Sequence, residues 1–457
     1  MPYRHDDFRL DRMRTLLDKL GSPDRRYAIV HIAGTKGKGS TAAMVTAILS
    51  AAGLGTGLFT SPHLEHIEER IRWNGQPIEP AEFADLIEQV RPAVLEMDVI
   101  CQRDGYGGPT FFEITTAMAL CCFAARGAAV VVLEVGLGGR LDSTNVVMPA
   151  VSAITSISFD HTKQLGRTLA AIAGEKCGII KPGIPVVSGV TDFEARDVVR
   201  HVADERCCSL RELSRDFEVA YESPCEGMLG EIVYRSKESS NPSQNVRKYQ
   251  LGLIGRHQAA NAALAITIAD ELCGQGFAIP DEAYARGLSE IQWPARIEVL
   301  QQAPTVVLDA AHNVASIAAL LETLRECFPA RKRWLIFATS RDKPAEQMLR
   351  QLRTAFDEIV LTRYQHNPRA VPIEQLAEML ASADVGSPWH RSWTEKQSRR
   401  WHRRADDARR ETRRPEIHQI ATPAEAWDFV RARAQPEDLI CITGSFFLAA
   451  EIRPLLK

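Results

Sequence analysis

Residues 33–41 read Ala-Gly-Thr-Lys-Gly-Lys-Gly-Ser-Thr and stand between an apolar run and a helix-like stretch. Glycines permit positive φ angles and close backbone approach, so successive N–H groups can surround phosphate oxygens at the start of the following helix. Lys38 would reach the terminal phosphates, and Ser40 would ligate Mg²⁺. The pattern departs from the common phosphate loop, because Gly39 separates the lysine from the hydroxyl. We predict a variant loop for a nucleoside triphosphate, formed by Gly34, Thr35, Lys36, Gly37, Lys38, Gly39, Ser40 and Thr41. The alternative is a glycine-rich turn with a surface lysine.

Acidic and imidazole groups follow two further strand-like runs. Glu134 ends the apolar run 130–134, and Asp160 and His161 come just after the run 152–158. A carboxylate at the carboxyl edge of an open α/β sheet is well placed to ligate Mg²⁺, because such sheets bind their ligands at that edge. Asp160 could hold the ring nitrogen of His161 that does not face a metal. The alternatives are a solvated strand-end residue for Glu134 and a packing residue for His161.

An acid and an imidazole recur together late in the chain. Asp309 and His312 lie at and just beyond the end of the strand-like run 306–309. The alternative interpretation is that Asp309 caps the N-terminus of a helix and that His312 is incidental. Lys176 stands in a segment of small residues, and by composition alone it would be a surface lysine.

The elements that must position these residues alternate between strand and helix. Continuous apolar strands separated by helices indicate a mostly parallel sheet covered on both faces. We predict a doubly wound, mostly parallel α/β domain with the phosphate loop over residues 1–294, and a smaller Rossmann-like α/β domain over residues 295–457. The boundary follows Trp293-Pro294, because proline disfavours helix at the residue before it. The predicted strands are 28–32, 56–60, 130–135, 151–157 and 185–188, and then 306–309, 334–338, 359–361 and 439–443.

Two polar stretches fit neither pattern. Residues 235–248 are typical of a hairpin tip or a loop. Residues 386–415 hold nine arginines, three tryptophans and four acidic residues, which interrupt the second domain. We interpret this stretch as an inserted, solvated arm. The alternative is a surface that contacts RNA or an acidic partner.

Length and composition bound the class of protein. A chain of 457 residues exceeds one ordinary domain core, and 45% hydrophobic with 25% charged residues is typical of a globular protein. A formal net charge of −3 argues against an extended surface for nucleic acid or anionic membrane. The N-terminal stretch lacks the apolar core of a signal peptide, and no run approaches the roughly 20 apolar residues needed to cross a bilayer. We expect a cytoplasmic monomer whose partners are small molecules, with no membrane or nucleic acid among them.

These motifs together resemble the folylpolyglutamate synthase and dihydrofolate synthase family, relatives of the Mur ligases that build peptidoglycan precursors. The motif Ser61-Pro62-His63 and the segment 138–142 distinguish this family from the Mur ligases. Lys36 stands where many bacterial members have asparagine. A lysine at this position resembles the eukaryotic type of loop. The resemblance covers nearly the whole chain, through residues 34–41, 60–64, 69–71, 110–113, 133–145, 160–162, 175–180, 257–261, 293–297, 308–313, 367–370 and 444–446.

The resemblance implies an ATP-dependent ligase with Mg²⁺. Members of the family activate a substrate carboxylate as an acyl phosphate, and the amine of glutamate attacks it to give an amide, ADP and phosphate. The resemblance assigns the β- and γ-phosphates to Lys38 and the loop backbone. It assigns one Mg²⁺ to Ser40, Ser61 and Glu134. A second Mg²⁺ would be held by His161, Glu134 and a carbamylated Lys176.

Further roles follow from the same resemblance. Asn261 and Arg296 would hold the nucleotide, while Asp309 and His312 would orient glutamate and the acyl phosphate. Thr110, Phe112 and Asp142 match pterin-binding positions of bifunctional bacterial members. The ring of Phe112 could stack on the flat pterin, and Asp142 could accept its N–H donors. The alternative for these three is ordinary packing and a loop cap.

The identity of the substrate that supplies the carboxylate distinguishes several candidate functions. We favour a bifunctional enzyme that adds glutamate both to dihydropteroate and to folates that already carry glutamate. The alternatives are chain extension alone, or a Mur-type or cyanophycin-type ligase that acts on another carboxylate. A nucleotide-dependent switch or an RNA-binding ATPase that uses the arginine-rich arm is an alternative from another class.

Overall fold

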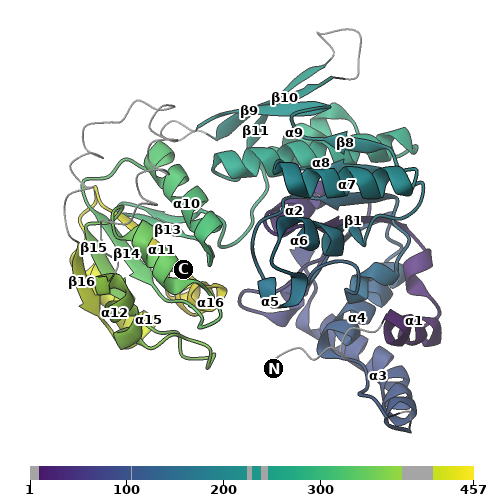
Figure 1. Cartoon of the computed structure of the whole chain (residues 1–457), viewed down its shortest axis with the longest axis horizontal. Helices are drawn as coiled ribbons and strands as arrows, with labels where there is room; N and C mark the ends of the chain where they lie inside the picture. The colour runs from purple at the N-terminus through teal and green to yellow at the C-terminus, as the bar shows by residue number, and fades with distance from the viewer. Residues whose placement is uncertain (1–9, 104, 224–228, 238–244, 383–414, 457) are drawn as a thin grey trace. The chain divides into compact units, whose positions relative to one another are not determined.

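The computed structural model describes residues 10–103, 105–223, 229–237, 245–382 and 415–456 (Figure 1). The chain separates into two compact units, Met1–Gln292 and Trp293–Lys457. Among the described helices, none is both long enough and apolar enough to cross a membrane.

The first unit is built on an eight-stranded sheet in the order β4-β3-β2-β5-β1-β6-β7-β8. The strands β2, β5, β1, β6, β7 and β8 pair in parallel, and β3 and β4 are added in antiparallel pairing. Strands β1, β2, β5 and β6 therefore all end at the same edge of the sheet. The bounds are β1 (Ala28–Ala33), β2 (Thr56–Phe59), β3 (Ile71–Trp73), β4 (Gln76–Pro77), β5 (Val130–Glu134), β6 (Val151–Ile154), β7 (Val186–Ser188) and β8 (Leu210–Glu212).

Helices cover both faces of this sheet. Ile29 of β1 belongs to an apolar cluster with residues of α1, α3 and α4, and Ala33 belongs to one with residues of α6 and α7. Because side chains alternate along a strand, Ile29 and Ala33 share one face. Helix α2 packs on β2 and β5 and against α8 and α9, and it covers the opposite face. The bounds are α1 (Leu10–Lys19), α2 (Lys38–Ala51), α3 (Pro80–Arg103), α4 (Phe111–Ala125), α6 (Leu169–Cys177), α7 (Phe193–Glu205), α8 (Arg256–Gly274) and α9 (Asp281–Ser289).

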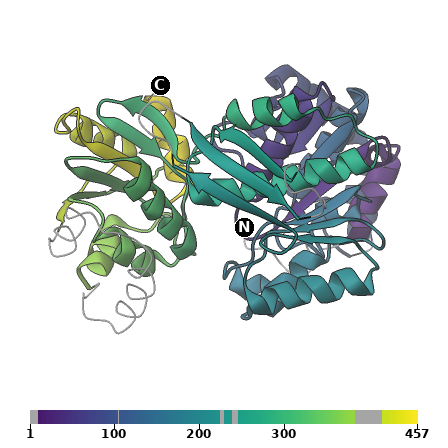
Figure 2. The same cartoon turned by 90° about the horizontal axis from the view of Figure 1, so that it is seen from above.

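A small antiparallel sheet completes the first unit, in the order β11-β10-β9. Its strands are β9 (Phe217–Glu222), β10 (Gly230–Ser236) and β11 (Val246–Leu251), drawn in teal in Figure 2. Arg235 pairs with Val246, so the described ends of the stretch 235–248 form a hairpin. The rest of that stretch, 238–244, lies outside the described residues.

The second unit is a six-stranded sheet in the order β12-β13-β17-β14-β15-β16. All pairs are parallel except that of β12 with β13. The strands are β12 (Glu298–Gln302), β13 (Thr305–Leu308), β14 (Arg333–Phe337), β15 (Glu358–Leu361), β16 (Glu416–Gln419) and β17 (Leu439–Thr443), and the helices are α10 (Val314–Cys327), α11 (Ala345–Leu352), α12 (Ile373–Ser382), α15 (Pro423–Arg431) and α16 (Phe446–Ile452). The mixed α/β class with mostly parallel sheets in both units confirms the predicted fold. Of the predicted arm at 386–415, all but Pro415 lies outside the described residues.

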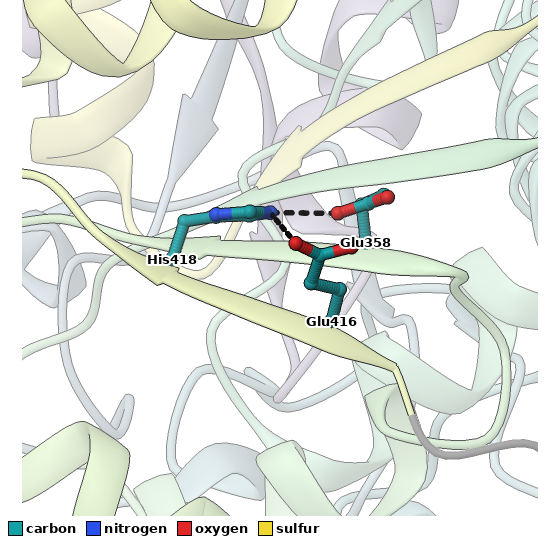
Figure 3. A group of neighbouring side chains, drawn as sticks. All are labelled: Glu358, Glu416 and His418. Carbon is teal, nitrogen blue, oxygen red and sulfur yellow. Dashed lines mark hydrogen bonds and ion pairs between the residues drawn. The ribbon is translucent and has the colours of Figure 1, made fainter.

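Polar side chains of the edge strand β16 contact a glutamate of the neighbouring strand β15 (Figure 3). Nε2 of His418 lies 2.6 Å from Oε2 of Glu358 and 3.9 Å from Oε1 of Glu416. The second oxygen of Glu358 accepts a hydrogen bond of 2.5 Å from Nζ of Lys332. Burial acts to raise the pKa of Glu358, but the Lys332 and His418 bonds outweigh it and hold that pKa below its usual value. Glu358 therefore has a cationic partner already, and we interpret the three residues of Figure 3 as part of an ion-pair network.

Candidate active site

The predicted phosphate loop connects β1 to α2 at the carboxyl edge of the first sheet. Helix α2 begins at Lys38, and Gly37 is its N-cap with a φ of 82°. A Cβ atom on Gly37 would lie 2.3 Å from Oδ1 of Asn261, and one on Gly34 would lie 1.9 Å from Oγ1 of Thr155. Both positions therefore require glycine. The loop also receives a hydrogen bond of 2.6 Å from Oγ1 of Thr155 to the Lys36 carbonyl, which anchors it to the segment after β6.

Two predicted magnesium ligands and one predicted phosphate contact meet beside this loop: Glu134, Ser61 and Lys38. Glu134, the last residue of β5, is buried, and its Oε2 accepts a hydrogen bond of 3.1 Å from the backbone N–H of Ser61. Its Oε1 lies 3.9 Å from Nζ of Lys38. Ser40 and Thr41 are buried in the first turn of α2. A carboxylate and hydroxyl groups are the oxygen donors that Mg²⁺ prefers, so Glu134, Ser40 and Ser61 fit such an ion.

Lys176 is brought into the same region from the last turn of α6. Its Nζ donates a hydrogen bond of 2.9 Å to the carbonyl of Gly34. The residue is only 4% exposed, so a surface position, expected from composition alone, is wrong. Burial, and next the charge of Lys38, lower the pKa of Lys176 to about 7. A large part of its amine is therefore neutral near physiological pH.

Asp160 differs from its predicted role. Its Oδ2 accepts a hydrogen bond of 2.7 Å from Nζ of Lys36. Nε2 of His161 lies 3.8 Å from Oδ1 of Asp160, which is longer than a hydrogen bond. The carboxylate of Asp160 thus pairs with Lys36 of the loop. The predicted hydrogen bond between Asp160 and the ring of His161 is not formed at 3.8 Å. His161 has a φ of 49° and a side chain that is 45% exposed.

Thr110 and Phe112 lie at the start of α4. Thr110 is the N-cap, and its side chain accepts a hydrogen bond from the N–H of Glu113. The ring of Phe112 lies 5.8 Å from that of Phe59, measured between centroids. It also packs against Gly136, where a Cβ atom would come within 2.6 Å of Cζ of Phe112. The aromatic ring is therefore held against the segment that follows β5.

Asp142 is buried in the loop after β5, and its carboxylate caps that loop. Oδ2 accepts a hydrogen bond of 2.9 Å from the N–H of Leu137, and Oδ1 accepts bonds of 3.0 and 2.5 Å from the N–H and hydroxyl of Thr144. Burial raises the pKa of Asp142, although these hydrogen bonds oppose the effect. Asp142 thus makes the contacts of a loop cap, and its assignment to the pterin stays a prediction.

Asn261 lies in α8 and approaches the phosphate loop from that side. Its Nδ2 donates a hydrogen bond of 2.9 Å to Oε1 of Gln258, and its Oδ1 faces Gly37. Of the predicted residues in the first unit, the structure thus gathers Lys38, Ser61, Glu134, Lys176 and Asn261 around one loop.

In the second unit, Asp309 and His312 follow β13. The two carboxylate oxygens of Asp309 accept hydrogen bonds of 2.9 and 2.8 Å from the N–H groups of Ile297 and Ala311. The N-cap of α10 is Asn313, so the alternative in which Asp309 caps this helix is wrong. Burial raises the pKa of Asp309, and the charge of Arg296 opposes that rise.

Phe446 joins these residues, although no role was predicted for it. Its ring centroid lies 4.8 Å from Cζ of Arg296 and 5.8 Å from the ring of His312. Nδ1 of His312 lies 2.8 Å from the carbonyl oxygen of Ala310. Phe446 is the first residue of α16, which follows the strand β17. Because β17 neighbours β13, the strand order is the signal that would have placed Phe446 there.

Comparison with known proteins agrees with this arrangement. The Mur ligase middle domain matches residues 32–269, and the glutamate ligase domain of Mur ligases matches residues 295–446. The dihydrofolate synthase/folylpolyglutamate synthase of Bacillus subtilis is 36% identical over 450 residues, which cover 98% of this chain and 95% of that protein. The chain belongs to the dihydrofolate synthase/folylpolyglutamate synthase family. It is therefore an ATP-dependent ligase, as predicted.

Solved structures of this family have the same fold. The Mycobacterium tuberculosis folylpolyglutamate synthase complexed with ADP and AMPPCP is 31% identical with a TM-score of 0.83, and the match covers 98% of this chain and 95% of that one. E. coli FolC in complex with DHPP and ADP is 25% identical with a TM-score of 0.78, over 98% of this chain and 92% of that one. The predicted family and the predicted use of ATP are confirmed.

Proposed function

We propose that this chain is bifunctional and adds L-glutamate both to dihydropteroate and to the γ-glutamyl chain of folates. The observation that carries the proposal is the meeting of Lys38, Glu134 and Lys176 at the phosphate loop of a chain that is similar to such synthases over nearly its whole length. Its bacterial relative is named for both activities. Transfer of the γ-phosphoryl group to the substrate carboxylate would give an acyl phosphate and ADP. Attack by the glutamate amine would then give the amide and phosphate.

The first unit would position ATP. Lys38 and the N–H groups of the loop bind the β- and γ-phosphates, because a lysine and a helix N-terminus both favour negative charge. Ser40, Ser61 and Glu134 would hold one Mg²⁺, and His161 and Glu134, with a carbamylated Lys176, a second. When bound, Mg²⁺ neutralises charge on the transferring phosphoryl group. Outside the loop, Asn261 and Arg296 would also hold the nucleotide, although Arg296 belongs to the second unit.

Carbamylation of Lys176 is supported by its burial and by its lowered pKa. The neutral amine attacks CO₂, one N–C bond forms, and one proton is released to give a carbamate. This change replaces a cation with an anion beside Lys38, where a second ammonium is repelled. The anionic oxygens could then ligate Mg²⁺.

The proposal also assigns substrate recognition to five side chains. Phe112 stacks on the pterin, with Thr110 and Asp142 beside it, while Asp309 and His312 orient glutamate and the acyl phosphate. We further propose that the chain works as a cytoplasmic monomer.

Chain extension alone is the second candidate. The relative that favours it is the folylpolyglutamate synthase of Lacticaseibacillus casei, which is 32% identical over 97% of this chain and 94% of that protein. The test is ADP release by the purified chain with MgATP and glutamate, with either dihydropteroate or tetrahydrofolate, and mass analysis of the products. Turnover of both supports the bifunctional enzyme, and turnover of tetrahydrofolate alone supports chain extension. Turnover of neither would overturn both candidates.

A further inference from the structure

Arg12 of α1 forms a buried ion pair with Glu113 of α4, 101 residues away in the sequence. Its Nε donates to both carboxylate oxygens of Glu113, at 3.0 and 2.9 Å. Only 3% of the Arg12 side chain and 2% of the Glu113 side chain are exposed. A terminal nitrogen of Arg12 also donates a hydrogen bond of 3.2 Å to the carbonyl of Gly107. One guanidinium group thus holds the chain on both sides of the point where α4 begins.

Glu113 passes this restraint on to Thr110. Oε2 of Glu113 accepts hydrogen bonds of 2.7 and 2.8 Å from the N–H and the hydroxyl of Thr110. The hydroxyl of Thr110 accepts in return from the N–H of Glu113 at 3.3 Å. A continuous chain of hydrogen bonds therefore runs from Arg12 through Glu113 to Thr110.

Starting a helix does not require this arrangement. Helix α15 begins with the same kind of capping box, formed by Thr422 and Glu425, and that glutamate is exposed. A buried carboxylate is strongly unfavourable unless a cation and hydrogen bonds compensate for its lost hydration. The burial of Glu113 under Arg12 thus goes beyond what the helix start needs, and it ties the first turn of α4 to α1.

The start of α4 carries two of the three residues to which the proposed function assigns the pterin, Thr110 and Phe112. We propose that Arg12 is a positioning residue for the pteridine substrate, which through Glu113 fixes Thr110 and Phe112 for the pterin ring. This inference rests on the proposed function. The ring of Phe112 is already held by Phe59 and Gly136, and Arg12 adds a restraint on the turn that carries it.

The test compares Arg12→Met and Arg12→Lys with two matched controls. Arg126→Met removes the ion pair with Glu82 at the other end of the same helix, where the two charged atoms are 2.6 Å apart. Leu16→Ala removes a fully buried side chain from α1 and so lowers stability without touching the ion pair. For each variant, the midpoint of thermal unfolding is determined first. The kcat and the KM values for dihydropteroate and ATP are then measured at a temperature below the unfolding transition.

We expect Arg12→Met to raise the KM for dihydropteroate about tenfold or more, with the KM for ATP changed less than about twofold. Arg12→Lys should restore part of the affinity, and both controls should leave the KM for dihydropteroate unchanged. An unchanged KM, equal rises in both KM values, or the same rise in Leu16→Ala would overturn the proposal.

Two further outcomes are distinguishable. If Arg12→Met does not fold, Glu113→Gln carries the same test, because its amide keeps an oxygen acceptor for Thr110 and loses the charge that binds Arg12. An unaltered enzyme that turns over neither pteridine would overturn the proposed function, and this inference with it. An unaltered enzyme with full turnover and unshifted variants would overturn the positioning role alone.

Discussion

Replacing Lys176 with methionine should abolish ligation and yet stabilise the metal-free protein near neutral pH. The amine of Lys176 is buried and donates to the carbonyl of Gly34 at 2.9 Å. Burial first, and then the charge of Lys38, lower its pKa from 10.5 to about 7. Methionine keeps a similar length and removes the ammonium, so the cost of burying a charge disappears.

The magnitude follows from linkage between protonation and folding. A pKa lowered from 10.5 to about 7 corresponds to about 5 kcal/mol that the fold loses by burying the ammonium. Between those two pH values the unfolded chain binds the proton more tightly than the folded one, so stability rises with pH across that window. The full cost applies below the folded pKa. The lost hydrogen bond to Gly34 offsets about 1 kcal/mol, so we expect methionine to stabilise by about 2–4 kcal/mol at pH 7.

The assay is urea unfolding at several pH values from about 7 to 10. The buffer contains EDTA, so that no metal binds, and is depleted of CO₂, so that no carbamate forms. Stability of the unaltered protein should rise relative to that of Lys176→Met across this range. Lys248→Met, which changes an exposed lysine of β11, is the matched control and should follow the unaltered protein. A destabilised Lys176→Met protein at pH 7, or equal pH dependence in both, would refute the reasoning.

Three further predictions test the loop, the phosphate contacts and the edge strand. Gly37→Ala should raise the KM for ATP about tenfold or more, because the new Cβ meets Oδ1 of Asn261 at 2.3 Å; unchanged nucleotide binding by calorimetry would contradict this. Lys38→Ala and Glu134→Ala should each lower ligation at least about a hundredfold without changing the circular dichroism spectrum, and normal turnover by either would exclude its role. His418→Ala should lower the free energy of unfolding by about 1 kcal/mol or less at pH 7. Urea unfolding should show that this difference becomes smaller as the pH falls through the lowered pKa of Glu358, the nearer carboxylate in Figure 3.

Much of the fold could be predicted because local sequence patterns indicate its strands and helices. The long β-branched runs that became β1, β5 and β6 are buried on both faces, and such strands are apolar throughout. Strands β3 and β8 have three residues each and are only partly buried, and they were not predicted. The strands of the small sheet β9–β11 contain both buried and exposed residues, and they were not predicted.

The site was harder to predict from the sequence than the fold, because its contacts join segments that are distant in the chain. The loop and Glu134 were found because strand-end residues meet at one edge of a parallel sheet. The burial of Lys176 and the pairing of Lys36 with Asp160 depend on tertiary packing, which spacing does not reveal. The pair of Arg12 with Glu113 spans 101 residues and has no local signal at all.

The most direct test of the account follows the carboxylate oxygen through the reaction. The purified chain would be given MgATP, L-glutamate and dihydropteroate whose carboxylate is labelled with heavy oxygen, and both products would be analysed by mass. We predict dihydrofolate and inorganic phosphate that carries one labelled oxygen, because an acyl phosphate transfers that atom when glutamate attacks. Unlabelled phosphate, or the absence of dihydrofolate, would contradict the account.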